Sequence, residues 1–211
     1  MLYSELQCSD AIHKAVERMG FAEMTEIQEK TIPVMMAGHD VIAKAPTGTG
    51  KTCAFGIPVA EHIVPENKYP QAVIMAPTRE LAQQIAQELE ELTYFMPEVQ
   101  VACVYGGANM EKQAKRLAEG CQIVVATPGR LMDHYKHHSI DISHVTQIVL
   151  DEADEMLNMG FYKDVRHIIE MMKARKSLSM FSATISREVM DIGWLYQHNA
   201  EEITVQPKEE S

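Results

Sequence analysis

Near residue 50 the chain carries the stretch Ala43-Lys44-Ala45-Pro46-Thr47-Gly48-Thr49-Gly50-Lys51-Thr52, from which the fold can be built outward. The stretch follows the apolar run Val41–Ala43, which predicts a strand, and precedes Cys53–Ile57, which predicts the start of a helix. A strand, a glycine-containing turn and Gly-Lys-Thr at a helix start form the pattern of a phosphate-binding loop. Backbone N–H groups of the turn and of the first helical turn then converge on an anion.

The residue types at several positions of this loop have a chemical explanation. Gly48 and Gly50 accept a positive φ and have no Cβ to block a phosphate. Lys51 supplies a mobile charge for the β- and γ-phosphates, and the Thr52 hydroxyl can ligate Mg²⁺. The general pattern begins with Gly where this chain has Ala45, and the alternative interpretation is a glycine turn before an ordinary helix. The predicted nucleotide-binding residues of the loop are Ala45, Pro46, Thr47, Gly48, Thr49, Gly50, Lys51 and Thr52.

The composition is that of a globular domain. The 211 residues are 46% hydrophobic and 23% charged, with no apolar run near the roughly 20 residues that span a membrane. The segment Met1–Glu5 lacks the features of a signal peptide, and the four cysteines form no C-x-x-C pair, so we expect reduced thiols and a cytoplasmic location. Because the net charge is −11, nucleic-acid binding must rest on a local patch or on backbone dipoles.

Strand and helix patterns alternate from Val41 to Val205. The strands are continuous apolar runs, which is typical of strands covered on both faces. The sequence therefore predicts an α/β fold with a mostly parallel central sheet and helices on both sides. Strands are expected at 41–43, 72–76, 99–105, 123–126, 146–150, 178–181 and 203–205. One expected helix, Thr25–Met36, contains Pro33, which predicts a break or kink.

Unusual tripeptides and tetrapeptides follow most of these strands. In an open α/β sheet, ligands bind beyond the carboxyl ends of the strands, so we expect one extended functional face there. The segments at these ends are Pro77-Thr78-Arg79, Gly106-Gly107, Thr127-Pro128-Gly129-Arg130, Asp151-Glu152-Ala153-Asp154 and Ser182-Ala183-Thr184.

The acidic segment supplies candidates for catalysis. A carboxylate at the end of an apolar strand beside a phosphate loop suits the Mg²⁺ of a bound nucleotide, usually through water, and this role falls to Asp151. Glu152 can then accept a proton from the attacking water. The alternative is that both acids stabilise a helix N-terminus.

Asp151-Glu152-Ala153-Asp154 is the signature of the DEAD-box RNA helicases, and the chain resembles that family over essentially its whole length. The other segments follow in the family's order: Ala45–Thr52, Pro77–Ala82, Gly106-Gly107, Thr127–Arg130 and Ser182–Thr184 resemble motifs I, Ia, GG, Ib and III. The family's motif I tolerates Ala at its first position. The resemblance implies a RecA-like P-loop fold and an RNA-dependent ATPase, with Lys51, Asp151 and Glu152 as the catalytic residues.

A further element resembles the family's adenine-reading Q motif. It spans Gly20–Gln28, with Tyr3 upstream where the family has Phe. The Gln28 amide has both a donor and an acceptor, which matches adenine and not guanine, and Phe21 can stack on the base. The alternative is a capping box, because Thr25-x-x-Gln28 also has that pattern.

The remaining strand-end segments are implied to contact the RNA backbone, without sequence specificity. The chemistry agrees at Thr127, an N-cap candidate followed by Pro, which leaves free N–H groups facing an anion; a simple helix start is the alternative. The implied RNA-binding residues are Pro77, Thr78, Arg79, Gly106, Gly107, Thr127, Pro128, Gly129 and Arg130. The resemblance also implies that Asp154, Ser182 and Thr184 couple the RNA site to the ATP site.

The resemblance divides the chain into a Q-motif region at 1–29, a RecA-like domain at 30–205 and the start of a linker at 206–211. The family's second RecA-like domain, which carries catalytic arginines and half of the RNA site, is expected to be absent here, so this chain alone should hydrolyse little ATP. The expected partners are RNA and that second domain, with no membrane. A different class of function, a non-catalytic nucleotide-binding module that docks to a partner, would need none of Lys51, Thr52, Asp151 and Glu152.

Two further segments are given ordinary interpretations. His134, His137 and His138 share a helical spacing, but solvent-exposed histidines are expected rather than a metal site. The segment Glu88–Glu91 is expected to be a solvated helix face.

Overall fold

The computed structural model describes residues 1–46, 48 and 50–206, and the described chain forms a seven-stranded sheet in which every strand pair is parallel. The strands are β1 (Val41–Lys44), β2 (Ala72–Met75), β3 (Val101–Val104), β4 (Ile123–Ala126), β5 (Gln147–Leu150), β6 (Ser177–Ser182) and β7 (Glu201–Thr204). Their order across the sheet is β3-β4-β2-β5-β6-β1-β7. The α/β fold with a parallel sheet is thus confirmed.

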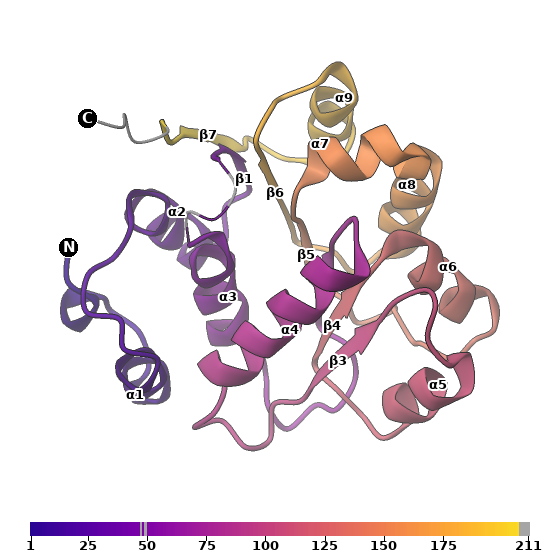
Figure 1. Cartoon of the computed structure of the whole chain (residues 1–211), viewed down its shortest axis with the longest axis horizontal. Helices are drawn as coiled ribbons and strands as arrows, with labels where there is room; N and C mark the ends of the chain where they lie inside the picture. Colours follow the sequence, from indigo (N-terminus) through magenta and orange to yellow (C-terminus); the bar gives the residue numbers. More distant parts are fainter. Residues whose placement is uncertain (47, 49, 207–211) are drawn as a thin grey trace.

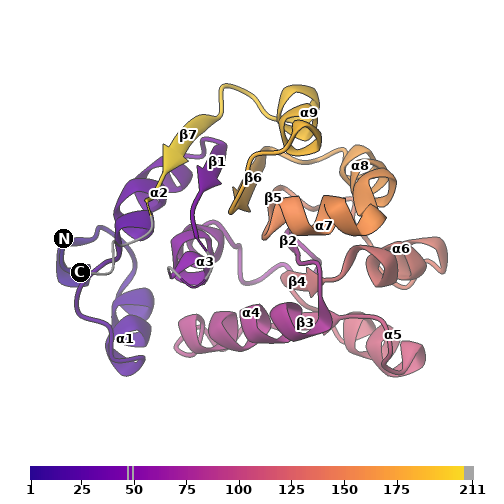
Figure 2. The same ribbon diagram turned by 45° about the horizontal axis from the view of Figure 1, so that its top comes forward.

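The helical elements occupy both faces of this sheet (Figures 1 and 2). They are η1 (Tyr3–Glu5), α1 (Asp10–Arg18), α2 (Glu26–Met36), α3 (Lys51–Glu61), α4 (Arg79–Leu92), α5 (Met110–Ala118), α6 (Pro128–Lys136), α7 (Ala153–Met156), η2 (Leu157–Phe161), α8 (Tyr162–Met171) and α9 (Arg187–Tyr196). In Figure 1 the indigo-to-violet helices α1 to α3 lie on one side of the strands and α6 to α9 on the other.

Two hydrophobic cores correspond to the two faces. Successive residues of a strand point to opposite faces, so Ile74 of β2 joins the core beneath α1 to α4, whereas Val73 and Met75 join the core beneath α5 to α9. Phe55 of α3 packs against Phe181 of β6, with ring centroids 5.3 Å apart. This packing fixes the start of α3, and with it the phosphate loop, over the centre of the sheet.

The N-terminal segment is part of the same packed unit. Tyr3 is buried in the core beneath α1 to α4, and its backbone N–H donates to the carbonyl of Ala22. Leu2 forms an isolated antiparallel bridge with Glu23. The region predicted to read adenine is therefore held against the domain by both side-chain burial and backbone hydrogen bonds.

Two local features add to the sequence interpretation. The predicted break at Pro33 is absent, because α2 continues through Pro33 to Met36, and the burial of Ile32 and Met35 offsets the hydrogen bond that proline cannot make. The second concerns residues 153–161, which follow the two acids for which a helix N-terminus was the alternative interpretation. There α7 begins within the acidic segment and passes into the π-helical turn η2, with Gly160 at φ 93°, before α8 begins at Tyr162.

The strand order sorts the predicted segments along one edge of the sheet. Because all strands are parallel, their carboxyl ends meet at this edge. The neighbours β3, β4 and β2 lead into the three segments predicted to contact RNA. The neighbours β5, β6 and β1 lead into the acidic segment, Ser182–Thr184 and the phosphate loop. The fold therefore separates a predicted RNA end from a predicted nucleotide end. No helix in the described ranges has the length and apolar character to cross a membrane.

Candidate nucleotide and RNA sites

The phosphate loop is tied to its neighbours at both ends. Where it leaves β1, the Ala45 N–H donates to the Ser182 carbonyl at 3.0 Å. Gly48 and Gly50 have φ of 81° and 78°, as predicted from the sequence. A Cβ at Gly50 would lie 2.7 Å from Nε2 of Gln28, so both the backbone angle and the packing require glycine there. Thr47 and Thr49, also predicted to bind nucleotide, lie outside the described residues.

Lys51, the first residue of α3, points to the acidic segment. Its Nζ lies 3.2 Å from Oδ1 of Asp151 and 4.0 Å from Oε1 of Glu152, and its side chain is only 8% exposed. Asp151 is almost fully buried at the end of β5. This burial raises the pKa of Asp151, although the Lys51 ammonium opposes the shift. The two residues predicted to handle phosphate and Mg²⁺ therefore meet in one place.

Glu152 occupies a strained position beside this pair. It has φ 47° and ψ 51°, a left-handed conformation that is uncommon for a residue with a side chain, and its N–H donates to Oδ1 of Asp151 at 2.9 Å. Burial raises the pKa of Glu152 to about 7, assisted by a hydrogen bond with Glu155 and by the charge of Asp151 and opposed by Lys51. A carboxyl group with a pKa near neutrality suits proton transfer.

A cavity of about 1150 Å³ joins these groups to the N-terminal region. Phe21 and Gln28 line one part of the cavity, and Lys51, Thr52 and Asp151 line another part. Among the described residues, those predicted to bind base, phosphate and Mg²⁺ thus share one cavity, except the buried Ala45. Pro46, Gly48 and Gly50 also line it.

Helix α4 contributes a wall that the sequence interpretation missed. Leu81, Gln84, Glu88 and Glu91 line the cavity, so the prediction that Glu88–Glu91 is a solvated face was wrong for Glu88 and Glu91. Burial raises the pKa of Glu88, against hydrogen bonds with Thr52 and Gln84 that lower it. The spacing of these four residues, which places them on one helical face, was the available signal.

Gln28 is both a capping residue and a neighbour of the phosphate loop. Its Oε1 accepts from the Thr25 N–H at 3.0 Å and from the Tyr3 hydroxyl, and its Nε2 donates to the Gly50 carbonyl at 3.1 Å. The predicted capping box is therefore present. The ring of Phe21 is 45% exposed and lies 6.4 Å from the ring of Tyr3 between centroids, which leaves it accessible for stacking.

The acidic segment is bonded to Ser182–Thr184. The Asp154 N–H donates to Oγ of Ser182 at 3.0 Å, and the Thr184 hydroxyl donates to Oδ2 of Asp154 at 2.8 Å. Burial alone would raise the pKa of Asp154, but the hydrogen bonds from Thr184 and Ser182 outweigh it and keep the pKa below its usual value. Hydrogen bonds thus join the two segments that the family resemblance implies to be coupled.

At the other end of the sheet edge, the predicted RNA segments lie side by side. The Arg79 guanidinium lies over the ring of Tyr105, 4.7 Å from its centroid. Arg79 is also close to Gly107, because a Cβ added at Gly107 would lie 3.8 Å from Nη1 of Arg79. Gly106 and Gly107 are exposed. Thr78 caps α4 by accepting from the Leu81 N–H. Thr127 is the N-cap of α6 with Pro128 at the first turn, as predicted, while Pro77 and Pro128 are themselves buried.

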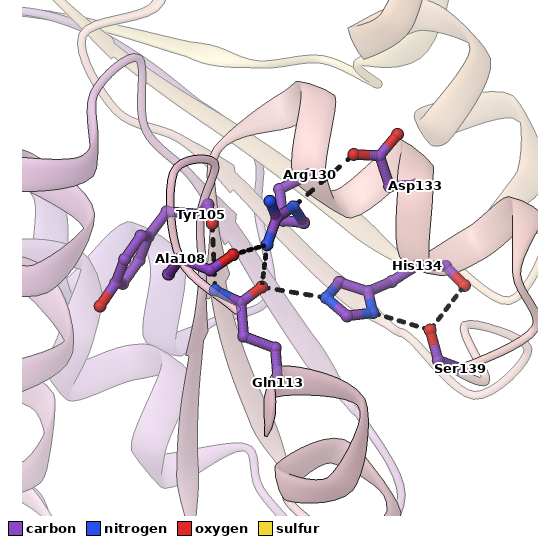
Figure 3. Close-up of polar contacts among 7 residues, drawn as sticks. All are labelled: Tyr105, Ala108, Gln113, Arg130, Asp133, His134 and Ser139. Carbon is purple, nitrogen blue, oxygen red and sulfur yellow. Dashed lines mark hydrogen bonds and ion pairs between the residues drawn. The ribbon is translucent and has the colours of Figure 1, made fainter. Parts of the chain in front are cut away.

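Arg130 and His134 point inward (Figure 3). Nη1 of Arg130 donates to the Ala108 carbonyl and to Oε1 of Gln113, each at 3.0 Å. His134 is fully buried and contacts Gln113 and Ser139, so the expectation that it is solvent-exposed was wrong; His137 and His138 are exposed. Within the described ranges no three His, Cys, Asp or Glu side chains are grouped to hold a metal.

Comparison with known proteins agrees with this geometry. A sequence model of the family "DEAD/DEAH box helicase" matches residues 25–192. The "ATP-dependent RNA helicase CshA" of Limosilactobacillus reuteri is 46% identical over 99% of this chain, which corresponds to 42% of that protein. The "ATP-dependent RNA helicase DeaD" of Mycobacterium tuberculosis is 40% identical over 98% of this chain and 37% of that protein. The chain thus spans about two fifths of the length of these curated relatives.

A solved structure shares the fold as well. The crystal structure of a DEAD box protein from the hyperthermophile Methanococcus jannaschii superposes with a TM-score of 0.91 and 39% identity, covering 98% of this chain and 56% of that one. The fold, the segments at the strand ends and a family match over most of the sequence agree, and the chain belongs to the DEAD/DEAH box helicase family.

Proposed function

We propose that this chain is the ATP-binding domain of an RNA-dependent ATPase and RNA helicase. The observation that carries the proposal is the meeting of Lys51 and Asp151 at 3.2 Å, on the wall of the cavity that also contains Thr52 and Glu152. A module that only docks to a partner would not require this set of groups. The family membership and the names of its relatives support the same function.

The residues present fit a magnesium nucleotide. The Thr52 hydroxyl and the Asp151 carboxylate are hard oxygen donors, and Mg²⁺ in such sites keeps several waters and binds one or two protein groups plus phosphates. The absence of a three-ligand cluster in the described ranges is compatible with that mode. The N-terminus of α3 and Lys51 would hold the phosphates, and bound Mg²⁺ would neutralise charge on their oxygens. Asp151 would hold the ion through water.

Glu152 would orient the attacking water and accept its proton. Its raised pKa, near 7, and its position beside Asp151 suit this role. Gln28 and Phe21 would read and stack on adenine, with Tyr3 behind them. Both acceptor positions on Oε1 of Gln28 are used by Thr25 and Tyr3, so adenine recognition by this oxygen requires one of these bonds to lengthen or open.

RNA would bind at the β3-β4-β2 end through its backbone. The exposed Gly106 and Gly107, the cation Arg79 and the N-terminus of α6 are suited to phosphates and sugars rather than to bases. The hydrogen bonds of Asp154 with Ser182 and Thr184 would transmit changes between the two ends. A second RecA-like domain would complete both sites, and the free thiols of Cys8, Cys53, Cys103 and Cys121 support a cytoplasmic location.

Steady-state ATP hydrolysis, with and without single-stranded RNA, tests this function. The chain alone should turn over slowly, and RNA should not rescue it, because arginines from a second domain contribute roughly 10³–10⁵ in rate in related phosphoryl transfers. A version extended into a second RecA-like domain should gain ATPase activity and RNA affinity together. Glu152→Gln in the extended protein is the control for background activity. Vigorous RNA-stimulated turnover by the chain alone, well above its own Glu152→Gln variant, would contradict the two-domain proposal.

A further inference from the structure

One buried amide connects the two segments that face the predicted RNA end. Gln113 of α5 is only 7% exposed. Its Nε2 donates to the Tyr105 carbonyl at 3.0 Å, and its Oε1 accepts from Nη1 of Arg130 and from Nε2 of His134, both at 3.0 Å. Figure 3 shows the amide between the Tyr105–Ala108 turn and helix α6. Nη1 of Arg130 also donates to the Ala108 carbonyl, so the turn is held at two carbonyls.

The partners permit one orientation of this amide. In the flipped amide, Nε2 would face the donor of Arg130, and Oε1 would face the Tyr105 carbonyl. Since Oε1 faces His134, Nε2 of the imidazole must carry a proton. Burial, and then the charge of Arg130, lower the pKa of His134, and its Nδ1 lies 2.7 Å from Oγ of Ser139, whose hydroxyl donates to the His134 carbonyl at 3.1 Å. The imidazole and the amide therefore belong to one chain of hydrogen bonds.

Arg130 is part of this chain rather than a free surface cation. Its Nη1 is used twice on the inner side, and its Nε is covered, with no hydrogen bond among the described residues and with Oδ2 of Asp133 3.6 Å away. The exposed groups at this end are instead backbone groups of Gly106 and Gly107 and the side chain of Arg79. The geometry of these exposed groups depends on what lies beneath them.

We infer that Gln113 is a positioning residue for RNA binding, which holds the Tyr105–Ala108 turn and the N-terminus of α6 in one fixed arrangement, and that Arg130 supports this turn from the inner side. The inference rests on the proposed RNA-binding function. Backbone groups from two loops can contact successive phosphates only if their separation is fixed, because a misplaced donor loses its hydrogen bond. The amide fixes that separation without touching RNA.

Gln122 offers a matched control. It is a fully buried glutamine that also makes three side-chain hydrogen bonds, to the Gln100 N–H and to the carbonyls of Pro65 and Glu98. It immediately precedes β4, whereas the predicted RNA segments follow the strands, so it lies at the opposite edge of the sheet. Gln122→Leu therefore removes the same side-chain chemistry at a distance from the RNA end.

The experiment measures binding of a fluorescent oligouridylate by anisotropy at low salt, MgADP affinity and amide hydrogen exchange, in the wild type, Gln113→Leu and Gln122→Leu. Gln113→Leu should bind RNA about tenfold more weakly, the equivalent of one to two lost hydrogen bonds, and its backbone amides should exchange faster at residues 105–109 and 129–131. Its MgADP affinity should stay within about twofold. Gln122→Leu should lower the melting temperature while leaving RNA affinity within about twofold of the wild type.

The outcomes separate the two claims. The variants are compared in the wild-type chain or, if that does not bind the oligouridylate, in its version extended into a second RecA-like domain; if neither version binds, the proposed RNA-binding function fails, and the positioning role fails with it. If the wild type binds and the two leucine variants weaken RNA equally, or neither does, the function stands and the positioning role is wrong. Should Gln113→Leu not fold, Gln113→Glu replaces it. That variant keeps acceptors for Arg130 and His134 but loses the donor to Tyr105, so it should show an intermediate loss, and wild-type RNA affinity would overturn the inference.

Discussion

The ammonium of Lys51 and the carboxylate of Asp151 form an ion pair, with Nζ 3.2 Å from Oδ1, at a point where both side chains are nearly excluded from solvent. In the proposed function Lys51 turns from Asp151 toward the nucleotide phosphates, and Asp151 becomes free to hold Mg²⁺ through water. The ion pair keeps both charges compensated in the structure described here, because an unpaired buried charge would be strongly destabilising. We therefore propose that the same two residues serve stability without nucleotide and binding with it.

Base selection tests the role of Gln28. Gln28→Ala should reduce the preference for MgADP over MgGDP by about tenfold, because a paired donor and acceptor contribute roughly 1–3 kcal/mol to base discrimination. Isothermal titration of both nucleotides measures this directly. Thr25→Ala is the control, since it removes the other member of the capping box and keeps the amide. If Gln28→Ala keeps the full preference for MgADP over MgGDP and only its melting temperature falls, the residue is a helix cap and the adenine proposal is wrong.

The raised pKa of Glu152 predicts a pH dependence of stability. The ordinary pKa of a glutamate side chain is 4.5, whereas the pKa of Glu152 in the folded protein is raised to about 7. The stabilising contribution of the protonated group is complete below pH 4.5 and is lost as the pH rises through 7. Glu152→Gln cannot ionise, so its melting temperature should rise relative to the wild type between pH 5 and about pH 8.

Thermal unfolding without nucleotide at several pH values tests this dependence. Glu90→Gln, at an exposed carboxylate of α4, supplies the control for a general effect of removing a negative charge. A difference between the wild type and Glu152→Gln that stays constant across the range would show that Glu152 ionises normally in the folded chain.

The hydrogen bond between Thr184 and Asp154 predicts coupling between RNA and ATP. In a protein that includes the second RecA-like domain, Thr184→Val and Asp154→Asn should each lower RNA stimulation of hydrolysis by about tenfold, corresponding to one charge-assisted bond. The double variant should be no worse than the poorer single variant, because both changes remove one interaction. Thr184→Ser keeps the hydroxyl and should retain stimulation. Additive losses in the double variant would show that the two residues act independently.

The sequence was sufficient to place the predicted segments at one edge of a parallel sheet. Continuous apolar strands alternating with helices permit a parallel sheet with both faces covered, and parallel strands place their ends together. The positive φ at Gly48 and Gly50, the N-cap at Thr127 and the bonds between Asp154 and Thr184 followed from local chemistry or from the family resemblance. These features depend on residues close in sequence or on short motifs.

Features that depend on packing between distant elements were missed. Glu88 lines the cavity because α4 packs against α3, and its helical spacing with Leu81 and Gln84 shows a shared face but not which element covers that face. His134 is buried because Gln113, 21 residues earlier, supplies a hydrogen-bond partner. The strand order that separates the two ends of the sheet edge is likewise a property of the assembled sheet rather than of any one segment.

The most direct test of the nucleotide site is calorimetric titration of MgADP into the wild-type chain, Lys51→Ala and Lys44→Ala. Lys44 is an exposed cation at the end of β1 and provides the same charge change outside the cavity. Lys51→Ala should bind MgADP at least about tenfold more weakly, because a hydrogen bond to a charged group contributes roughly 1.5–3 kcal/mol, while Lys44→Ala should bind like the wild type. Unchanged MgADP affinity in a folded Lys51→Ala variant would contradict the assignment of this loop and of the site built on it.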